Sequence, residues 1–131
     1  MNLTIDGEPT GKGRPRFANG HAYTPEKTRD YERYTRILFV AQNRNVKPLE
    51  GMVAVNIKAY FGIPKSKSKR QKEDMAIGII RPTKKPDTDN ITKIILDSLN
   101  GLAYLDDKQV VDLQVAKWYG KPRVEVEILE L

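Results

Sequence analysis

The sequence contains no cysteine and only one histidine among its 131 residues. Without cysteine the chain cannot form disulfides, thiol nucleophiles, zinc knuckles or iron–sulfur clusters, and His21 alone cannot make a multi-histidine metal site. The chain also lacks an apolar run near the roughly 18 residues that a membrane span needs, and its opening residues MNLTIDGEPT lack the layout of a signal peptide. We therefore expect a cytoplasmic protein without a membrane partner.

The composition is otherwise that of an ordinary globular protein, with 39% hydrophobic residues. A chain of this length can bury a core without disulfides or a structural metal. We expect residues 1–131 to form one domain.

Charge is unevenly distributed along the chain, whose formal net charge is +6. Residues 1–85 contain 18 lysines and arginines against 8 acidic residues, whereas residues 86–131 contain 5 against 9. A surface that serves solubility alone would intersperse the two signs. The separation predicts a polyanionic partner for the first part and a cationic partner for the second.

Hydrophobic periodicity and turn residues predict six main elements of secondary structure. Thr24 and Pro25 are typical of a helix start, with a hydroxyl cap before a proline in the first helical position. The expected elements are a strand at 1–6, a helix at 25–44, a strand at 52–63, a helix at 90–100 that ends at Gly101, and two strands within 110–129. The buried face of the first helix is predicted from apolar residues at helical spacing, namely Tyr31, Tyr34, Ile37, Leu38 and Ala41.

Two segments between these elements are expected to be loops. Residues 7–20 are broken by glycine and proline, and residues 64–78 form a basic stretch with one or two helical turns from Ser68. The order β-α-β-α-β-β, with its terminal hairpin, predicts an α+β fold in which two main helices pack on a mixed sheet.

Two pairs of aspartates flank the second predicted helix. Asp87 and Asp89 follow Pro86, and if the chain stays extended there, both carboxylates face the same side. Asp106 and Asp107 come after the helix, which can fold back and bring them toward the first pair. Oxygen ligands of this kind are those that Mg²⁺ prefers, so the four residues are candidate metal ligands.

The same residues also have ordinary structural interpretations. Asp89 and Asn90 can cap the helix and complement its dipole, and the sequence DDK at 106–108 is a common turn composition. Lys93 can contact a phosphate one turn into the helix, or it can form a surface pair with Asp97. The sequence leaves these alternatives open.

Basic residues gather in three stretches that precede the first aspartate pair. The stretch GKGRPRF combines cations with a flexible glycine- and proline-rich backbone that can follow phosphates, and it offers Phe17 for stacking. Such runs can also be merely solvated surface. The candidate DNA-binding residues are Lys12, Arg14, Arg16, Lys65, Lys67, Lys69, Arg70, Lys72, Arg81, Lys84 and Lys85.

The motifs KKPDTDN at 84–90 and LDDKQVVD at 105–112, together with the helix between them and the final hairpin, resemble the RusA family of Holliday-junction resolvases. GKGRPRF and YTPEKTRDYE are similar to its variants carried by phages and prophages. The resemblance implies a homodimeric endodeoxyribonuclease of DNA recombination and repair that resolves four-way junctions by paired symmetric nicks, with Mg²⁺ as cofactor and Mn²⁺ as a substitute. It also implies site roles, which are catalytic aspartates at Asp87, Asp89 and Asp107, a functional lysine at Lys93, and further acidic positions at Asp106 and Asp97.

Two other functions remain open at this point. A non-enzymatic basic nucleic-acid-binding protein would use the aspartates only as caps and turns. A general nuclease would use the same carboxylates without a preference for junctions.

Overall fold

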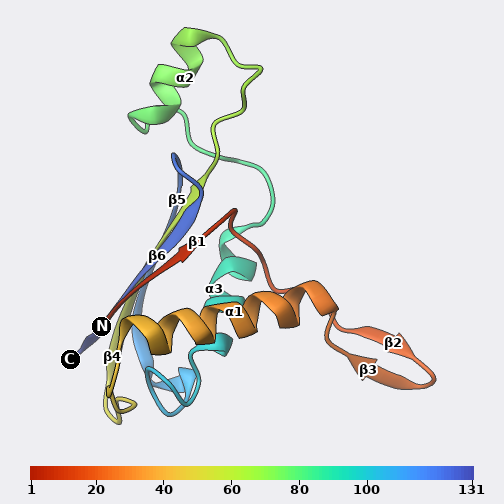
Figure 1. Ribbon diagram of the computed structural model, residues 1–131, viewed down its shortest axis with the longest axis vertical. Coiled ribbons are helices and arrows are strands. Elements are labelled where there is room, and N and C mark those ends of the chain that lie inside the picture. Colours follow the sequence, from red (N-terminus) through yellow and green to blue (C-terminus); the bar gives the residue numbers. More distant parts are fainter.

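The centre of the computed structural model, which describes residues 1–131, is a sheet of four strands, β1 (Asn2–Asp6), β4 (Val53–Phe61), β5 (Val110–Tyr119) and β6 (Arg123–Glu130) (Figure 1). Their order is β1-β6-β4-β5. β6 pairs antiparallel with β1 and β4, whereas β4 and β5 run parallel. The predicted α+β class with a mixed sheet is confirmed. The expected terminal hairpin is wrong, because β4 lies between β5 and β6 and pairs with both of them.

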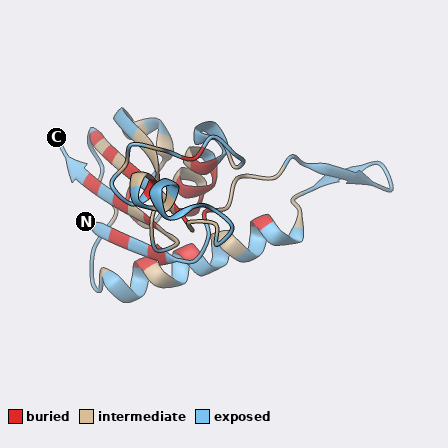
Figure 2. Ribbon diagram, turned by 90° about the horizontal axis from the view of Figure 1, so that it is seen from above, coloured by how far each residue is buried: buried red, intermediate tan, exposed pale blue.

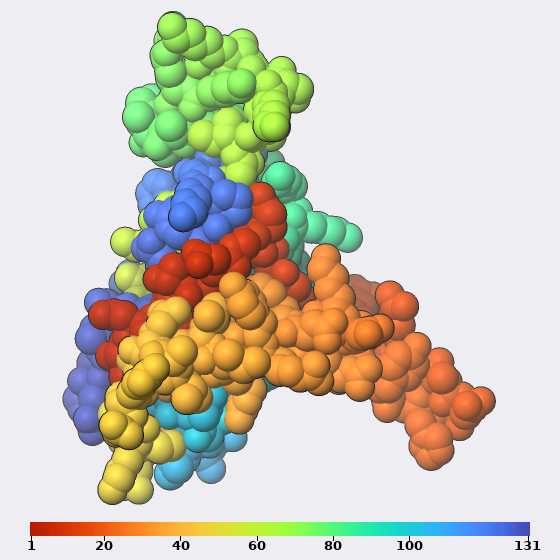
Figure 3. Space-filling model, viewed as in Figure 1, coloured from red at the N-terminus to blue at the C-terminus, as the bar shows by residue number.

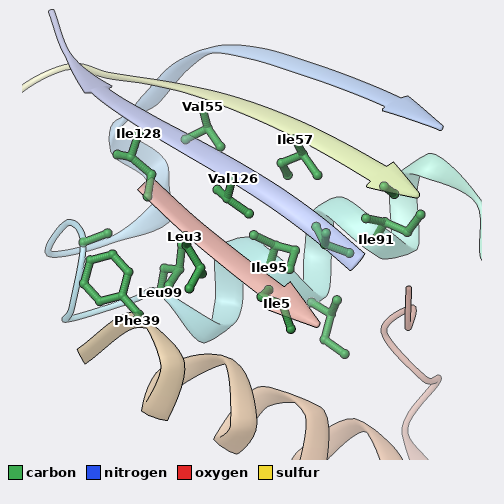
Figure 4. Close-up of a cluster of buried hydrophobic side chains, with 14 of the residues drawn as sticks. Leu3, Ile5, Phe39, Val55, Ile57, Ile91, Ile95, Leu99, Val126 and Ile128 are labelled. Atoms are coloured by element: carbon green, nitrogen blue, oxygen red, sulfur yellow. The ribbon is translucent and has the colours of Figure 1, made fainter. Parts of the chain in front are cut away.

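One face of this sheet is apolar and the other is largely polar. The residues of β4 alternate strictly in burial, as a strand with only one covered face requires. Two helices, α1 (Glu26–Gln42) and α3 (Thr88–Ser98), cover the apolar face, and Ile91, Ile94 and Ile95 of α3 are fully buried against it (Figure 4). The opposite face carries polar side chains such as Glu125 and Glu127 and has no helix over it (Figure 1).

The helix α1 buries a different stripe from the one expected. Its fully buried residues are Thr28, Thr35 and Phe39, whereas Ile37 is 60% exposed and Tyr34 is also exposed. Packing against β1 and α3 selects the stripe that contains the two threonines, and the Thr35 hydroxyl donates to the Tyr31 carbonyl at 2.8 Å, which satisfies it inside the protein. The expected buried face is therefore only partly right.

The observed N-terminal ends of the three helices agree only partly with those predicted from capping residues. Pro25 is the N-cap of α1 rather than its first helical residue, and no side chain caps that end. A short helix, α2 (Lys69–Ala76), begins after Ser68 as predicted, with a capping box formed by Ser68 and Gln71. The helix α3 begins two residues before the expected start, because Asp87 rather than Asp89 caps it.

The loop predicted at 7–20 contains the first strand of a two-stranded hairpin, formed by β2 (Arg16–Ala18) and β3 (His21–Tyr23). The turn residues Asn19 and Gly20 have φ values of 52° and 77°, as an Asn-Gly hairpin turn requires. Figure 2 shows the hairpin extending away from the body with all of its residues exposed, and Figure 3 shows it and the α2 region as two projections.

None of the three helices combines the length and the apolar character that a transmembrane helix requires.

Candidate functional site

The N-terminal end of α3 carries the first predicted pair of aspartates. An oxygen of the Asp87 carboxylate accepts a hydrogen bond from the backbone N–H of Asn90 at 3.0 Å, so Asp87 is the N-cap. Asp89 lies in the first turn, and both side chains are exposed. The extended chain expected beyond Pro86 stops at Asp87, because the helix begins at Thr88. The two carboxylates therefore sit on a helix start, where the helix dipole favours negative charge.

A polar hollow of about 890 Å³ lies beside this helix start. It is lined by the stretch from Pro9 to Arg16, the beginning of α1 and the residues around Asp87, and none of its lining residues is hydrophobic. The cations at its wall are Lys12, Arg14, Arg16, Lys27 and Lys85, and Asp87 is the only acidic residue. Lys27 was not among the predicted DNA-binding residues, because its place in the first turn of α1 gives no sign in the sequence that it faces this hollow.

The stretch Gly11–Lys12–Gly13 passes closely between α3 and α1 to reach this hollow. A Cβ at Gly11 would lie 2.8 Å from Cβ of Pro86 and 3.0 Å from Cβ of Asn90, so only glycine fits. The backbone N–H of Lys12 donates to the Asn90 carbonyl at 2.9 Å, and that of Gly13 donates to the Thr28 hydroxyl at 3.0 Å. These glycines serve close approach rather than the flexibility expected from the sequence, and they hold the root of the hairpin next to Asp87.

The Lys12 side chain is already paired inside the protein. Its Nζ lies 2.9 Å from Glu32 Oε2 and 3.2 Å from Asp97 Oδ2, and the side chain is 19% exposed. Burial by itself would lower the pKa of Lys12, but the hydrogen bonds and charges of Glu32 and Asp97 outweigh it, so the pKa is raised. Lys12 thus links the N-terminal stretch to α1 and α3. Its contact with DNA stays a prediction.

The second pair of aspartates lies near the C-terminal end of α3. Asp106 caps the short 3-10 turn Asp107–Gln109, since its carboxylate accepts from the Lys108 N–H at 2.9 Å. Burial raises the pKa of the Asp107 carboxyl, and the negative charges of Asp106 and Asp97 raise it further, with Lys93 opposing them. Three carboxylates therefore influence one another at this end, and the turn interpretation of Asp106 is correct in the structure.

The predicted metal ligands are not gathered in one place within a single copy. No group of three or more acidic or histidine side chains lies close enough together to hold a metal ion. Asp89 and Asp97 are eight residues apart on one helix, or about 12 Å along its axis, and Asp107 interacts with Asp97. The oxygen donors are of the type that Mg²⁺ prefers, but a single copy holds them at opposite ends of α3.

Lys93 lies on α3 between the two pairs. Its Nζ is 3.8 Å from Asp97 Oδ2, and its side chain is 63% exposed. An exposed pair of this kind contributes little to stability. The lysine is therefore available to another partner.

Lys117 is a further basic residue near Asp87 that the predictions missed. It lies on β5 in line with Leu113, Val115 and Tyr119, on the face covered by the helices, and its Nζ donates to the Lys84 carbonyl at 2.5 Å. Burial lowers the pKa of Lys117, with the positive charge of Lys84 adding to this and Asp87 opposing it. The alternating pattern of β5 was the available signal, because it places a lysine where an apolar residue is normal.

The remaining predicted DNA-binding residues are spread over the far end of the sheet and the α2 region. The Arg81 guanidinium stacks on the Trp118 ring at 3.7 Å, and Arg81 Nε donates to the Lys117 carbonyl at 2.8 Å, so this arginine fixes the base of the α2 projection. Lys84 and Lys85 lead into Asp87 and are exposed. The cations in and before α2 are also exposed, except for the half-buried Lys72; they are Lys65, Lys67, Lys69, Arg70 and Lys72.

The chain is similar to known proteins at the level of the family and of a single relative. The family model of the endodeoxyribonuclease RusA matches residues 6–129 of the chain. The chain is also 43% identical over 138 residues to YqaN of Bacillus subtilis (strain 168), a protein described as uncharacterized, and the match covers 100% of this chain and 96% of that protein.

Proposed function

The chain belongs to the RusA family of endodeoxyribonucleases, and on this premise we propose that it is a Mg²⁺-dependent enzyme that resolves four-way DNA junctions by paired symmetric nicks. Its role would be in DNA recombination and repair. The family supports endodeoxyribonuclease activity and junction DNA as the substrate.

The observation that carries the proposal is the polar hollow beside Asp87. Cations from the hairpin root, from α1 and from the segment before α3 surround one carboxylate at a helix start. A phosphodiester backbone fits such a wall, because forked guanidinium groups and lysines bind phosphate oxygens. Asp89 and Lys93 follow on the same helix within one to two turns, so the backbone would pass the residues that the family resemblance assigns to catalysis.

The proposed ligands of Mg²⁺, or of Mn²⁺ in its place, are Asp87, Asp89, Asp106 and Asp107. Because one copy holds these residues at opposite ends of α3, bringing all four to one cation requires either a change in the chain when DNA and the cation bind or carboxylates from a second copy. A bound divalent cation would supply a hydroxide-like nucleophile and neutralise charge that develops during phosphodiester hydrolysis. Lys93 would contact the phosphate oxygens, and the exposure of its side chain supports this role.

We further propose that the enzyme is a homodimer. Two symmetric cuts require two active sites, and one chain provides one set of the assigned residues. One candidate dimer interface is an exposed apolar stripe on α1, formed by Tyr34, Ile37 and Val40. The alternative is the unpaired edge of β5, which carries the exposed Val111. A dimer mass by light scattering, free or on a junction, is the expected result, and a monomer in both states contradicts it.

The test of the whole proposal uses three labelled DNAs of the same sequence, a four-way junction, a linear duplex and a single strand. Each is incubated with the protein in Mg²⁺ or in EDTA. Symmetric nicking of the junction alone, and only in Mg²⁺, is the expected result. Cleavage of all three DNAs indicates a general nuclease, and binding without any cleavage indicates a non-enzymatic DNA-binding protein.

A further inference from the structure

The composition of the hairpin of β2 and β3 is not explained by packing, because all of its residues are exposed. Residues 9–25 contain no aspartate or glutamate, and they include Lys12, Arg14, Arg16 and His21. Phe17 of β2 is 78% exposed, more than any other large hydrophobic residue of the chain. All residues of the hairpin are exposed, and the hairpin extends away from the body (Figure 2). Phe17 therefore does not contribute to the hydrophobic core.

The register of the hairpin leaves the Phe17 ring open. Phe17 lies directly opposite Ala22, and side chains of directly opposed residues share a face of the hairpin. A methyl group cannot cover a phenyl ring, so this face presents one bare aromatic surface. The other face carries Arg16 opposite Tyr23 and Ala18 opposite His21.

The position of the hairpin ties this aromatic surface to the phosphate-binding hollow. Arg14 and Arg16 line the hollow at the root of the hairpin, and the Gly13 N–H bond to the Thr28 hydroxyl anchors that root on α1. A strand of DNA whose backbone follows these arginines would have its bases within reach of the projection (Figure 1, Figure 3). Because the charge of Lys12 is already neutralised, Arg14 and Arg16 are the free cations at this point.

We propose that Phe17 stacks on an unpaired or unstacked base at the branch point of the DNA. This inference rests on the proposed function and adds the residue that reads the branched shape. In a linear duplex every base is covered by its neighbours, whereas bases at a branch point can present a free π-face. An exposed aromatic ring beside cations is the arrangement that binds such bases without sequence preference. A second copy of the chain is less suited to contact the hairpin, because Arg14 and Arg16 have no acidic residue beside them in residues 9–25, so two such hairpins repel each other.

The test measures binding in EDTA, so that it does not depend on cleavage. Junctions carry 2-aminopurine either at the branch point or in the middle of an arm, and binding of the wild-type protein should change the fluorescence only of the branch-point probe. Phe17→Ala should abolish that change and weaken junction binding about 5- to 150-fold, the effect of losing one stacked base, while duplex affinity changes by less than about twofold. Phe17→Trp should retain both signals, and Met52→Ala, an exposed apolar residue outside the hairpin, is the matched control.

Three results would overturn the proposal. Phe17→Ala with an unchanged ratio of junction to duplex affinity would show that the ring does not read the branch. Full binding by Phe17→Leu would show an apolar contact without stacking. A change of oligomeric state in Phe17→Ala without DNA, with DNA binding intact, would make the hairpin a protein interface. Failure of the proposed nuclease would be seen separately, as wild-type protein that gives the branch-point signal but never cuts in Mg²⁺.

Discussion

The two ends of α3 carry the same kind of side chain in opposite settings. At the N-terminal end Asp87 and Asp89 are exposed, one of them caps the helix, and cations line the adjacent hollow. At the C-terminal end Asp97 lies half-buried near Asp106 and Asp107, and burial with these like charges raises the pKa of Asp107. The helix start and the nearby cations stabilise the carboxylates at the N-terminal end. At the C-terminal end, burial and repulsion between the carboxylates disfavour their charged forms.

The helix dipole explains part of this difference. Partial positive charge at the start of a helix favours Asp87 and Asp89, and partial negative charge at the end disfavours Asp97, which lies in the last turn. Two lysines offset that penalty, since Lys12 and Lys93 approach Asp97 at 3.2 and 3.8 Å. The negative charge at the C-terminal end is therefore offset by the side chains of Lys12 and Lys93. A bound metal cation would also offset it.

The largest expected effect is on cleavage, and it tests whether the two ends form one site. Asp89→Asn and Asp107→Asn each keep the side-chain size but remove a charge that a divalent cation needs, so single-turnover junction cleavage in Mg²⁺ should fall by roughly three orders of magnitude or more. Binding in EDTA should stay the same or rise slightly, because each variant removes a negative charge near phosphate.

Two further variants give this comparison its controls. Asp112→Asn, an exposed carboxylate on the other face of the sheet, should cleave like the wild type. Asp87→Asn should lose cleavage while keeping the helix cap, since asparagine caps as well as aspartate. Loss of activity at Asp87 and Asp89 with normal activity in Asp107→Asn would show that the N-terminal end acts alone.

The next effect concerns the salt dependence of DNA binding, and it separates exposed cations from the mostly buried, paired Lys12. If about six to ten cations contact phosphates, junction affinity should fall on the order of 10³- to 10⁵-fold between 50 and 200 mM salt. Replacing Arg14, Arg16, Lys69 and Arg70 with alanine should lower the slope of log K against log salt by about three to four. Lys12→Met should leave the slope unchanged, because its charge is already paired; a drop in slope for Lys12→Met would place this lysine on the DNA.

Local patterns in the sequence were sufficient for the four strands of the sheet, for α3 and for the Ser68 start of α2, because alternation, helical spacing and capping residues are read within a few positions. The pairing of the last two strands was not predicted correctly, because no local pattern shows that β4 lies between β5 and β6. The hairpin was missed because its strands lack alternating apolar residues, and Asn19-Gly20 was the only signal. The pairing of Lys12 with Glu32 and Asp97 joins three distant segments, so no local pattern contains it. The aspartates were identified by motif, but their separation depends on where the chain returns after α3.

A smaller effect is expected on stability when the internal link at the C-terminal end is removed. Lys12→Met keeps the stem of the side chain but leaves Glu32 and Asp97 without their shared cation, so the free energy of unfolding should fall by about 1–2 kcal/mol, below the value for fully buried pairs because these groups are partly exposed. Urea denaturation at neutral pH measures this. Lys27→Met, at an exposed lysine that also lines the hollow, is the control and should unfold like the wild type. Equal stability of both variants would show that the Lys12 link contributes nothing.

The smallest effect should have opposite signs at the two ends of α3. Because the pKa of Asp107 is raised in the folded protein, the folded state binds this proton more tightly than the unfolded chain does. The carboxylate therefore destabilises the fold increasingly as the pH rises above the ordinary pKa, and fully once the pH exceeds the raised pKa. Asp107→Asn should therefore raise the melting temperature at pH 7 in EDTA, and the gain should shrink as the pH falls toward the ordinary value of about 3.9. Asp87→Asn keeps the cap but loses the favourable interaction of its charge with the helix start, so it should lose about 0.3–1 kcal/mol at pH 7. Melting curves of both variants and the wild type at pH 7 and near pH 4 decide the matter. If Asp107→Asn is less stable than the wild type at pH 7, the C-terminal carboxylates do not repel one another as described, and the contrast between the two ends of α3 fails.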